Sequence, residues 1–399
     1  MALTISQRCR NITPSMTLAI DAKAKEMKAA GLNVIGFGAG EPDFPTPAHI
    51  RDAAKEALDQ GLTRYTPVPG TPELRKAICA KLLRENGLSY EPSEIIVSDG
   101  AKHSLFNVFQ AILDPGDEVL IPSPCWVSYP EMVRMAGGVP VFIPTAEEDN
   151  FIPGEDAIRE RVTARTKAIV ITSPSNPNGS VWKKEQLEYV AELAVEHAFY
   201  VVSDEIYERL LYDGRRHVSI AQLGEKIKAQ TFVINGMSKA YCMTGWRVGY
   251  CAAPKALISA MSAFQSQSTS NANSVAQYAS VAALNGDQAC VDVMVAEYEK
   301  RRDNITERIN AVPGLSCRKP DGAFYVMMNI KDILGRAWHG TVIRDSMTFA
   351  DVLLREKQVA VVPGVAFEAE GYCRLSYAIS MEKINEGLDR IAAFVSELE

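Results

Sequence analysis

The stretch from residue 231 to residue 252 reads TFVINGMSKAYCMTGWRVGYCA, and it carries the strongest clue to the fold. It opens with an apolar run at 231–234 and closes with a second one at 248–252, while small and polar residues lie between them. Short apolar runs that end in polar or glycine-bearing loops are typical of strands buried inside a sheet. The segment therefore predicts two core strands, with a polar connection in which chemistry can be placed.

The same pattern recurs upstream, where longer amphipathic stretches separate the apolar runs. Buried strands are predicted at 94–98, 118–121, 168–172 and 200–203, and helices at 105–113 and 184–196. This alternation indicates an α/β fold with a mostly parallel central sheet flanked by helices. Such sheets bind ligands at the carboxyl ends of their strands, so the polar residues that follow each strand are the candidates for a site.

The two ends of the chain are expected to form a second unit. The segment before about residue 45 becomes rich in Gly and Pro, and the last hundred residues return to a mixed strand and helix pattern, with strands at 324–328, 359–362 and 374–378. The sequence thus predicts a large domain over residues 46–285. A smaller α+β domain would consist of residues 1–45 together with 286–399.

Composition and charge argue against several classes of protein. The 399 residues are 47% hydrophobic and 23% charged, as in globular proteins, and the formal net charge is −7, which disfavours nucleic acid or an anionic membrane as the main partner. The first thirty residues hold no long apolar run, and no later stretch is long enough to span a membrane. Eight scattered cysteines and five dispersed histidines form no disulfide framework or metal motif. We therefore expect a cytoplasmic protein without a metal site.

Lys239 follows the strand at 231–234, where a lysine is energetically expensive. An isolated buried ammonium is strongly disfavoured, so a lysine there either reaches water or serves as a neutral amine or a Schiff-base former. On composition alone, the solvated lysine is the better interpretation. Residues 236–240 (GMSKA) also differ from the G-x-S-x-G motif of hydrolases only at the last position, which keeps a hydrolase as a weak competitor.

Asp204 and Tyr207 follow the strand at 200–203. Asp204 would lie at the carboxyl edge of the sheet, and Tyr207 would reach the same place across one helical turn. Taken alone, Asp204 is better explained as the cap of the next helix.

Nine ordered segments resemble the class I and II aminotransferases, the pyridoxal-phosphate enzymes of fold type I, and most closely the bacterial aspartate aminotransferase branch of that family. The resemblance covers essentially the whole chain. The segments are 38–44 (GAGEPDF), 64–67 (RYTP), 100–102 (GAK), 124–130 (PCWVSYP), 175–179 (SNPNG), 203–207 (SDEIY), 238–240 (SKA), 245–250 (GWRVGY) and 374–377 (RLSY).

The resemblance implies roles around the cofactor ring. Lys239 would form the Schiff base with pyridoxal phosphate and carry the substrate proton. Asp204 would pair with the pyridinium nitrogen, so that the ring can accept electrons. Tyr207 and Asn176 would bond the phenolic oxygen, and Trp126 would stack on the ring.

The resemblance also implies a phosphate site and a dimer. Tyr65 would reach the phosphate of the neighbouring subunit, which makes a homodimer the catalytic unit. The residues implied to bind the phosphate within one chain are the backbone amides of Gly100, Ala101 and Lys102, the guanidinium of Arg247 and, less securely, Ser238.

For the substrate, Arg374 resembles the arginine that grips the α-carboxylate, with a backbone contact from Gly40. Trp126 and Asn176 would border the substrate as well. Lys102 matches the lysine that meets the distal carboxylate of aspartate or glutamate, although attraction to the cofactor phosphate explains it nearly as well. Ser15 and Thr17 are further candidates for the same pocket.

Two positions depart from the family pattern. Asn178 replaces the threonine of the usual N-P-T-G loop, and a turn-forming residue there should preserve the loop geometry. Gly236 stands where several relatives have a serine that bonds the phosphate, which would leave the phosphate one donor short.

The implied activity is transfer of the α-amino group of an L-amino acid, most plausibly L-aspartate, to 2-oxoglutarate in a ping-pong cycle. Aminotransferases for aromatic amino acids, alanine or a broad range remain open, and so does a pyridoxal-phosphate C–S lyase, because both need the same cofactor contacts. A regulatory module that binds the cofactor is remote, since the chain shows no basic DNA-binding extension and its net charge is negative.

Overall fold

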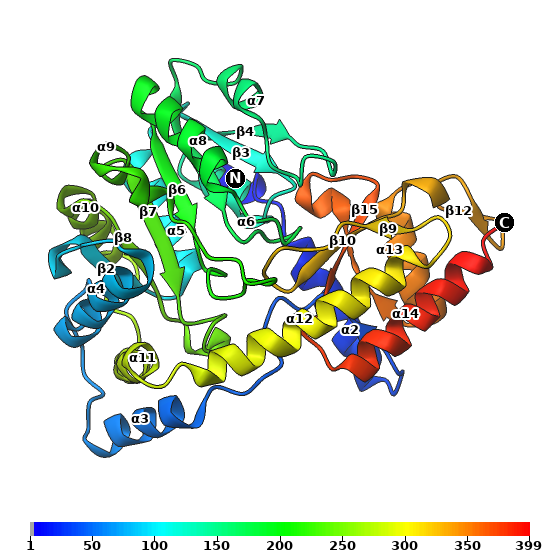
Figure 1. Cartoon of the computed structure of the whole chain (residues 1–399), viewed down its shortest axis with the longest axis horizontal. Coiled ribbons are helices and arrows are strands. Elements are labelled where there is room, and N and C mark those ends of the chain that lie inside the picture. The colour runs from blue at the N-terminus through cyan, green and yellow to red at the C-terminus, as the bar shows by residue number, and fades with distance from the viewer. Residues whose placement is uncertain (1–3) are drawn as a thin grey trace.

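The computed structural model describes residues 4–399 and shows a large twisted sheet between layers of helices, beside a smaller sheet (Figure 1). The sheet order is β2-β8-β7-β6-β5-β3-β4, and all strands from β7 to β4 run parallel. All six predicted core strands are present in it. The seven strands of the sheet are β2 (Ile95–Ser98), β3 (Glu118–Ser123), β4 (Val139–Pro144), β5 (Thr166–Thr172), β6 (Tyr200–Asp204), β7 (Thr231–Gly236) and β8 (Gly249–Ala252).

Two features of this sheet were not predicted. Strand β4 reads VPVFIP, and two prolines in six residues argue against a strand. It lies at the edge of the sheet, where a missing N–H is tolerated. Strand β8 runs antiparallel to both β2 and β7. The connection from β7 to β8 contains only a three-residue 3₁₀ helix (Thr244–Trp246), so no crossover helix returns the chain to a parallel strand.

Helices cover both faces of the large sheet, which explains why its strands are continuously apolar. On β6, Val201 packs in a cluster with Leu187 of α8 (Lys184–His197). Its neighbour Val202 points to the opposite face and packs with Leu105 and Phe109 of α5 (Ala101–Ile112). These two helices match the predicted ones.

The smaller sheet is antiparallel, with the order β14-β15-β10-β9. The N-terminal segment joins this part of the molecule, because β1 (Ile35–Gly36) pairs with β13 (Val359–Ala360). The sheet strands are β9 (Ser316–Cys317), β10 (Tyr325–Asn329), β14 (Val362–Pro363) and β15 (Tyr372–Ser376), and the helices beside them are α2 (Met16–Ala29), α12 (Ala289–Asn310), α13 (Ser346–Lys357) and α14 (Met381–Ser396).

The remaining elements are short or peripheral. No helix among the described residues is both long and apolar enough to cross a membrane. The other helices are α1 (Gln7–Arg10), α3 (Ala48–Asp59), α4 (Pro72–Asn86), α6 (Ser128–Met135), α7 (Glu155–Arg159), α9 (Glu225–Lys228), α10 (Lys255–Ser266) and α11 (Ser274–Asn285), and β11 (Ala337–Trp338) pairs with β12 (Thr341–Val342).

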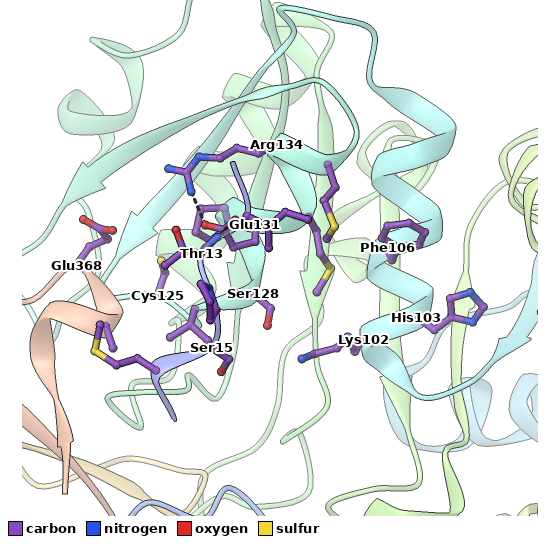
Figure 2. Close-up of a pocket in the computed structure, with 18 of the residues that line it drawn as sticks. Thr13, Ser15, Lys102, His103, Phe106, Cys125, Ser128, Glu131, Arg134 and Glu368 are labelled. Carbon is purple, nitrogen blue, oxygen red and sulfur yellow. Dashed lines mark hydrogen bonds and ion pairs between the residues drawn. The ribbon is translucent and has the colours of Figure 1, made fainter. Parts of the chain in front are cut away.

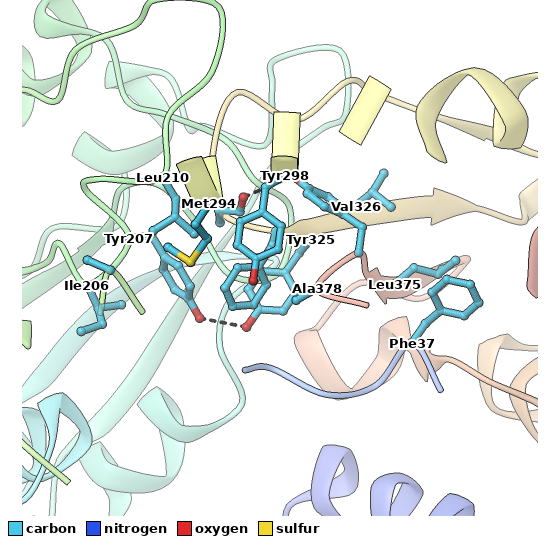
Figure 3. Packing of buried hydrophobic residues seen from close by; sticks show 14 of the residues in the cluster. Phe37, Ile206, Tyr207, Leu210, Met294, Tyr298, Tyr325, Val326, Leu375 and Ala378 are labelled. Atoms are coloured by element: carbon cyan, nitrogen blue, oxygen red, sulfur yellow. Dashed lines mark hydrogen bonds between the residues drawn. The ribbon is translucent and has the colours of Figure 1, made fainter. Parts of the chain in front are cut away.

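One buried apolar cluster joins the two sheets (Figure 3). Tyr207 enters it from the turn after β6, Tyr298 from α12, Tyr325 from β10 and Phe37 from the N-terminal segment. Side chains from distant parts of the sequence thus meet beside the carboxyl edge of the large sheet.

Candidate active site

A cavity of about 430 Å³ opens at the carboxyl edge of the large sheet, against the smaller sheet. It brings together nearly all of the predicted site residues, whereas Gly100 and Tyr65 lie outside its lining. The predicted residues on its wall are Ser15, Thr17, Gly40, Ala101, Lys102, Trp126, Asn176, Asp204, Tyr207, Ser238, Lys239, Arg247 and Arg374.

Asp204 ends strand β6 and is 4% exposed. The hydroxyl of Tyr129 donates to its Oδ2 at 2.7 Å and lies 2.7 Å from the hydroxyl of Thr172. Burial raises the pKa of Asp204 to about 6, although the bonds from Tyr129 and from the backbone of Ile206 oppose that shift. Within residues 4–399 no cation pairs with this buried carboxylate, which suits a protonated ring nitrogen.

Lys239 lies in the turn that follows β7, and its Nζ donates to the carbonyl oxygen of Gly40. The ammonium lies 5.7 Å from the centre of the Tyr207 ring. Burial lowers the pKa of Lys239 to about 8, with Arg247 and Arg374 acting in the same direction and Glu41 opposing them. Lys239 is half-buried on the cavity wall, and its lowered pKa brings it closer to a neutral amine than a lysine in bulk water would be.

Backbone N–H groups and a guanidinium meet at the N-terminus of α5. Gly100 precedes the helix with φ 88°, and a Cβ there would lie 2.4 Å from the guanidinium of Arg247. Arg247 itself is anchored by bonds from Nη1 to the carbonyl of Thr244 at 2.9 Å and from Nη2 to that of Asp99 at 3.3 Å. First-turn N–H groups and a fixed guanidinium together form a site that fits a phosphate.

Lys102 lies in the same first turn, with its Nζ 4.8 Å from the centre of the Trp126 ring. Burial, and then the charge of Arg247, lowers its pKa. A second cavity of about 590 Å³ adjoins the first, and Ser15 and Lys102 lie on the wall of both (Figure 2). Lys102 therefore faces space in two directions.

Arg374 of β15 is a buried cation, 3% exposed. Its Nη1 donates to Oδ1 of Asn176 at 3.0 Å and its Nη2 to the carbonyl of Gly38 at 2.7 Å. Its Nε has no partner among residues 4–399. A buried guanidinium with no carboxylate beside it fits a carboxylate ligand.

The two departures from the family pattern have local explanations. Oδ1 of Asn178 accepts from the backbone of Ser180 at 2.9 Å, so the loop keeps its turn. At Gly236, a Cβ would lie 2.8 Å from the carbonyl of Val248 and 2.9 Å from the Cα of Gly249. A serine would not fit there unless the neighbouring strand moved.

Tyr65 lies in the loop between α3 and α4 and is 92% exposed. It does not contribute to the cavity of its own chain.

Two aromatic hydroxyls at the site were not singled out from the sequence. Tyr129 belongs to the PCWVSYP segment, so the family resemblance of that segment could have indicated a place for it at the site. Tyr325 carried no such signal, because its contact with Tyr207 joins residues 118 positions apart.

A second group of charged residues lies outside the cavity, around the turn that follows β6. We call Lys81, Glu205, Glu208 and His217 the charge cluster. Ligand atoms of its two glutamates and His217 lie within 4.8 Å of one another, but Lys81 already donates to Glu208, so a cation is present without a metal.

Comparison with known proteins identifies the family. Residues 33–391 match the model of the family "Aminotransferase class I and II". The chain is 49% identical over 391 residues to the aspartate aminotransferase of Bacillus sp. strain YM-2, covering 98% of this chain and 99% of the relative. It is 46% identical over 397 residues to the aspartate/prephenate aminotransferase of Nitrosomonas europaea, covering 99% and 100%. A solved structure of the aspartate aminotransferase from Thermus thermophilus with maleate is similar at TM-score 0.93 and 48% identity, covering 98% of this chain and all of that one.

Proposed function

The chain belongs to the class I and II aminotransferases, which use pyridoxal phosphate, and from this premise we propose that its substrates are L-aspartate and 2-oxoglutarate. The observation that carries the proposal is the pair of cations on one cavity wall. Arg374 and Lys102 line the same cavity as the amine of Lys239, and Arg247, the further guanidinium there, is proposed for the phosphate. The two carboxylates of a dicarboxylic amino acid match Arg374 and Lys102. Relatives named as aspartate aminotransferases, and one solved with the dicarboxylate maleate, support the choice.

We propose that the cofactor is held by groups on three sides. The phosphate binds the amides of Ala101 and Lys102, and Arg247 adds a fixed charge beside them. The expected contact from Gly100 is not supported, because its N–H already donates to the carbonyl of Ser98 at 2.7 Å. Asp204 holds the proton of the ring nitrogen, which its buried carboxylate can do above about pH 6. The residues proposed to contact the ring and its oxygen are Trp126, Asn176, Tyr207 and Ser238.

When bound, pyridoxal phosphate supplies a sink for the electrons released at the substrate α-carbon. Lys239 accepts and returns the substrate proton. Its pKa of about 8 leaves a sizeable neutral fraction near pH 7.5, and a neutral amine is the form that attacks a carbonyl and accepts a proton. The same Nζ can then donate that proton to the cofactor carbon.

Arg374 and Gly40 are proposed to hold the α-carboxylate, beside Trp126 and Asn176. Because Oδ1 of Asn176 accepts from Arg374, the amide N–H groups of Asn176 are left for the cofactor oxygen. Lys102 is proposed to meet the distal carboxylate, with Ser15 and Thr17 on the same wall.

We further propose a homodimer in which Tyr65 reaches the phosphate of the partner. The exposure of this tyrosine in one protomer supports the idea. We divide the chain into a large domain, residues 46–285, and a small one, residues 1–45 with 286–399. The free state of all eight cysteines supports a cytoplasmic location.

The test is to mix the cofactor-loaded enzyme with single amino acids, without a keto acid, and follow its visible absorption. Aspartate and glutamate should convert the cofactor to its amino form, while aromatic, branched and basic amino acids should not. Conversion of the cofactor by another amino acid but not by aspartate would contradict the assignment of aspartate as the substrate. Release of pyruvate and ammonia without conversion would indicate a lyase.

The role of Lys102 has its own test. Lys102→Ala should raise KM for aspartate about 10- to 100-fold, because a charge-assisted bond is lost, and leave KM for alanine nearly unchanged. An equal loss with both substrates, together with faster cofactor dissociation, would assign Lys102 to the phosphate instead.

A further inference from the structure

We propose that Tyr325 is a positioning residue that links the phenol beside the cofactor, Tyr207, to the substrate-binding guanidinium, Arg374. The inference rests on the proposed function of those two residues. It assigns the hydroxyl of Tyr325 to Tyr207 and the ring of Tyr325 to Arg374, so that the two parts of one side chain act separately.

The hydroxyl contact is direct. The Oη atoms of Tyr207 and Tyr325 lie 2.9 Å apart, and both side chains are 4% exposed or less (Figure 3). Their rings meet edge to face, with centroids 5.7 Å apart and an interplanar angle of 83°. This packing fixes the hydroxyl of Tyr207 at one point on the cavity wall.

The direction of this hydrogen bond follows from the number of protons. Burial raises the pKa of both tyrosines, so each is a neutral phenol with one proton to donate. If Tyr207 donates its proton to the cofactor oxygen, Tyr325 must donate to the oxygen of Tyr207. Burial raises the pKa of Tyr207 far above its usual range and that of Tyr325 less far, while Arg374 lowers both, so Tyr325 is the more acidic donor and this direction is favoured. A phenol that accepts one bond also becomes a stronger donor in the next.

The ring contact lies on the other side of Tyr325. The guanidinium of Arg374 lies 4.6 Å from the centre of the Tyr325 ring and 4.9 Å from that of Phe367. Tyr325 pairs with Ser376 across the β10–β15 ladder, so Arg374 is its diagonal neighbour. The two rings hold the plane of the guanidinium while its hydrogen bonds to Asn176 and Gly38 set the rotation.

The hydroxyl of Tyr325 also borders Gly40, the residue that accepts a hydrogen bond from Lys239. A Cβ on Gly40 would lie 2.9 Å from Oη of Tyr325, and the carbonyl of Gly40 accepts from Nζ of Lys239. Tyr325 therefore lines the cavity beside three proposed site residues, and we assign it a positioning role, not that of an acid or base.

The experiment compares Tyr325→Phe, which removes only the hydroxyl, with Tyr325→Leu, which removes the ring as well. The first readout is the pH midpoint at which the visible absorption of the cofactor-loaded enzyme changes, measured without substrate. Tyr325→Phe should raise that midpoint by about half a unit, because Tyr207 becomes a weaker donor to the ring oxygen. Its KM for aspartate should stay within about twofold of wild type, whereas Tyr325→Leu should raise KM about tenfold.

The double variant Tyr207→Phe/Tyr325→Phe is the decisive control. Tyr207→Phe alone should shift the midpoint further than Tyr325→Phe, and the double variant should match Tyr207→Phe, because Tyr325 acts through Tyr207. An unchanged midpoint in Tyr325→Phe, or additive shifts in the double variant, would overturn the inference.

The readouts also separate this inference from the proposed substrate. The absorption midpoint needs no amino acid, so a shift in Tyr325→Phe would support the link to Tyr207 even if aspartate failed as a substrate. A wild-type enzyme without a pH-dependent visible band would overturn both the cofactor assignment and this inference.

Discussion

Asp204 and Glu205 are neighbours in the sequence, yet they belong to two regions with opposite electrostatics. In the candidate active site, burial raises the pKa of Asp204 to about 6 and lowers that of Lys239 to about 8. In the charge cluster, burial alone would raise the pKa of Glu208, but Lys81 and His217 hold it at about 2. Each region buries charges, but only in the charge cluster do the carboxylates face basic groups, and there Nδ1 of His217 keeps no hydrogen-bond partner among the described residues.

The charge cluster places its acidic groups beside basic ones. Oε1 of Glu205 accepts from Ser203 at 2.9 Å and from Ser219 at 2.6 Å, and its Oε2 lies 2.9 Å from Nε2 of His217. Glu208 accepts from Lys81, Asn86 and Asn235. Each of the two glutamates therefore faces a basic group, Glu205 facing His217 and Glu208 facing Lys81.

The candidate active site lacks that closure. Arg374 keeps an unpartnered Nε among the described residues, and Asp204 is bonded only by neutral groups. Unpaired buried charges destabilise a fold, so their presence indicates groups held ready for a charged ligand. The comparison separates residues that act on a ligand from residues that hold the protein together.

The largest expected effect is at Lys239. Lys239→Ala should abolish covalent attachment of the cofactor and lower turnover by at least about 10³-fold, because the amine that attacks the cofactor and moves the proton is gone. Borohydride reduction followed by peptide mass spectrometry measures the attachment. Lys102→Ala is the matched control and should retain it. Attachment at another lysine with wild-type turnover would contradict the assignment.

Asp204→Asn should separate activity from stability. We expect single-turnover conversion by aspartate to slow about 10²- to 10⁴-fold, since the ring nitrogen loses its carboxylate. The melting temperature should stay level or rise, because a desolvated carboxylate is removed. Glu205→Gln is the neighbouring control, for which the melting temperature should fall and the single-turnover rate should change little. The reverse pattern would refute the division between the regions.

Glu208→Gln should destabilise the fold by about 3–5 kcal/mol, because Lys81 is left as a buried ammonium without its carboxylate. Denaturant unfolding at neutral pH measures this loss. The double change Lys81→Met/Glu208→Leu should recover much of it, since neither charge is then left alone. A single variant as stable as wild type would show that the ion pair contributes little.

The smallest effect is a pH dependence of stability. Glu205 raises the pKa of His217 against the opposing effect of burial, with Glu208 reinforcing the rise and Lys81 reducing it. The contribution of His217 to the free energy of unfolding is therefore complete below its unfolded pKa of about 6.5. It is lost as pH rises through its pKa in the folded protein. Glu208, with its pKa held low, contributes above about pH 4.5 and loses that contribution as pH falls toward 2.

Free energies of unfolding across this range test the pH prediction. His217→Asn should flatten the decline above about pH 6.5 and leave the acid decline in place. An alkaline decline that is identical in this variant would assign the effect to another group.

The parts of the fold that follow a local pattern were predictable from the sequence. The core strands appeared as apolar runs, and Asp204 and Lys239 appeared as polar residues after two of them, because strand ends place chemistry at a fixed edge. The prolines of β4 concealed a strand that the sheet edge tolerates. The role of each motif residue came from the family resemblance and not from its spacing.

Contacts between distant segments were not predictable. Tyr325 meets Tyr207 across 118 positions, and Lys81 meets Glu208 across 127. No local pattern encodes such a pair, because it depends on how the finished elements pack. The separation of Asp204 from Glu205 has the same origin, since two adjacent carboxylates look alike until their surroundings are known.

The most direct test of this account is the pH dependence of amine labelling in the cofactor-free protein, with each lysine followed by peptide mass spectrometry. We expect Lys239 to react with a midpoint near pH 8, while Lys81, paired and 3% exposed, remains unlabelled in the folded protein. A midpoint for Lys239 near the ordinary lysine value of about 10.5, or labelling of Lys81 at the same rate, would contradict it.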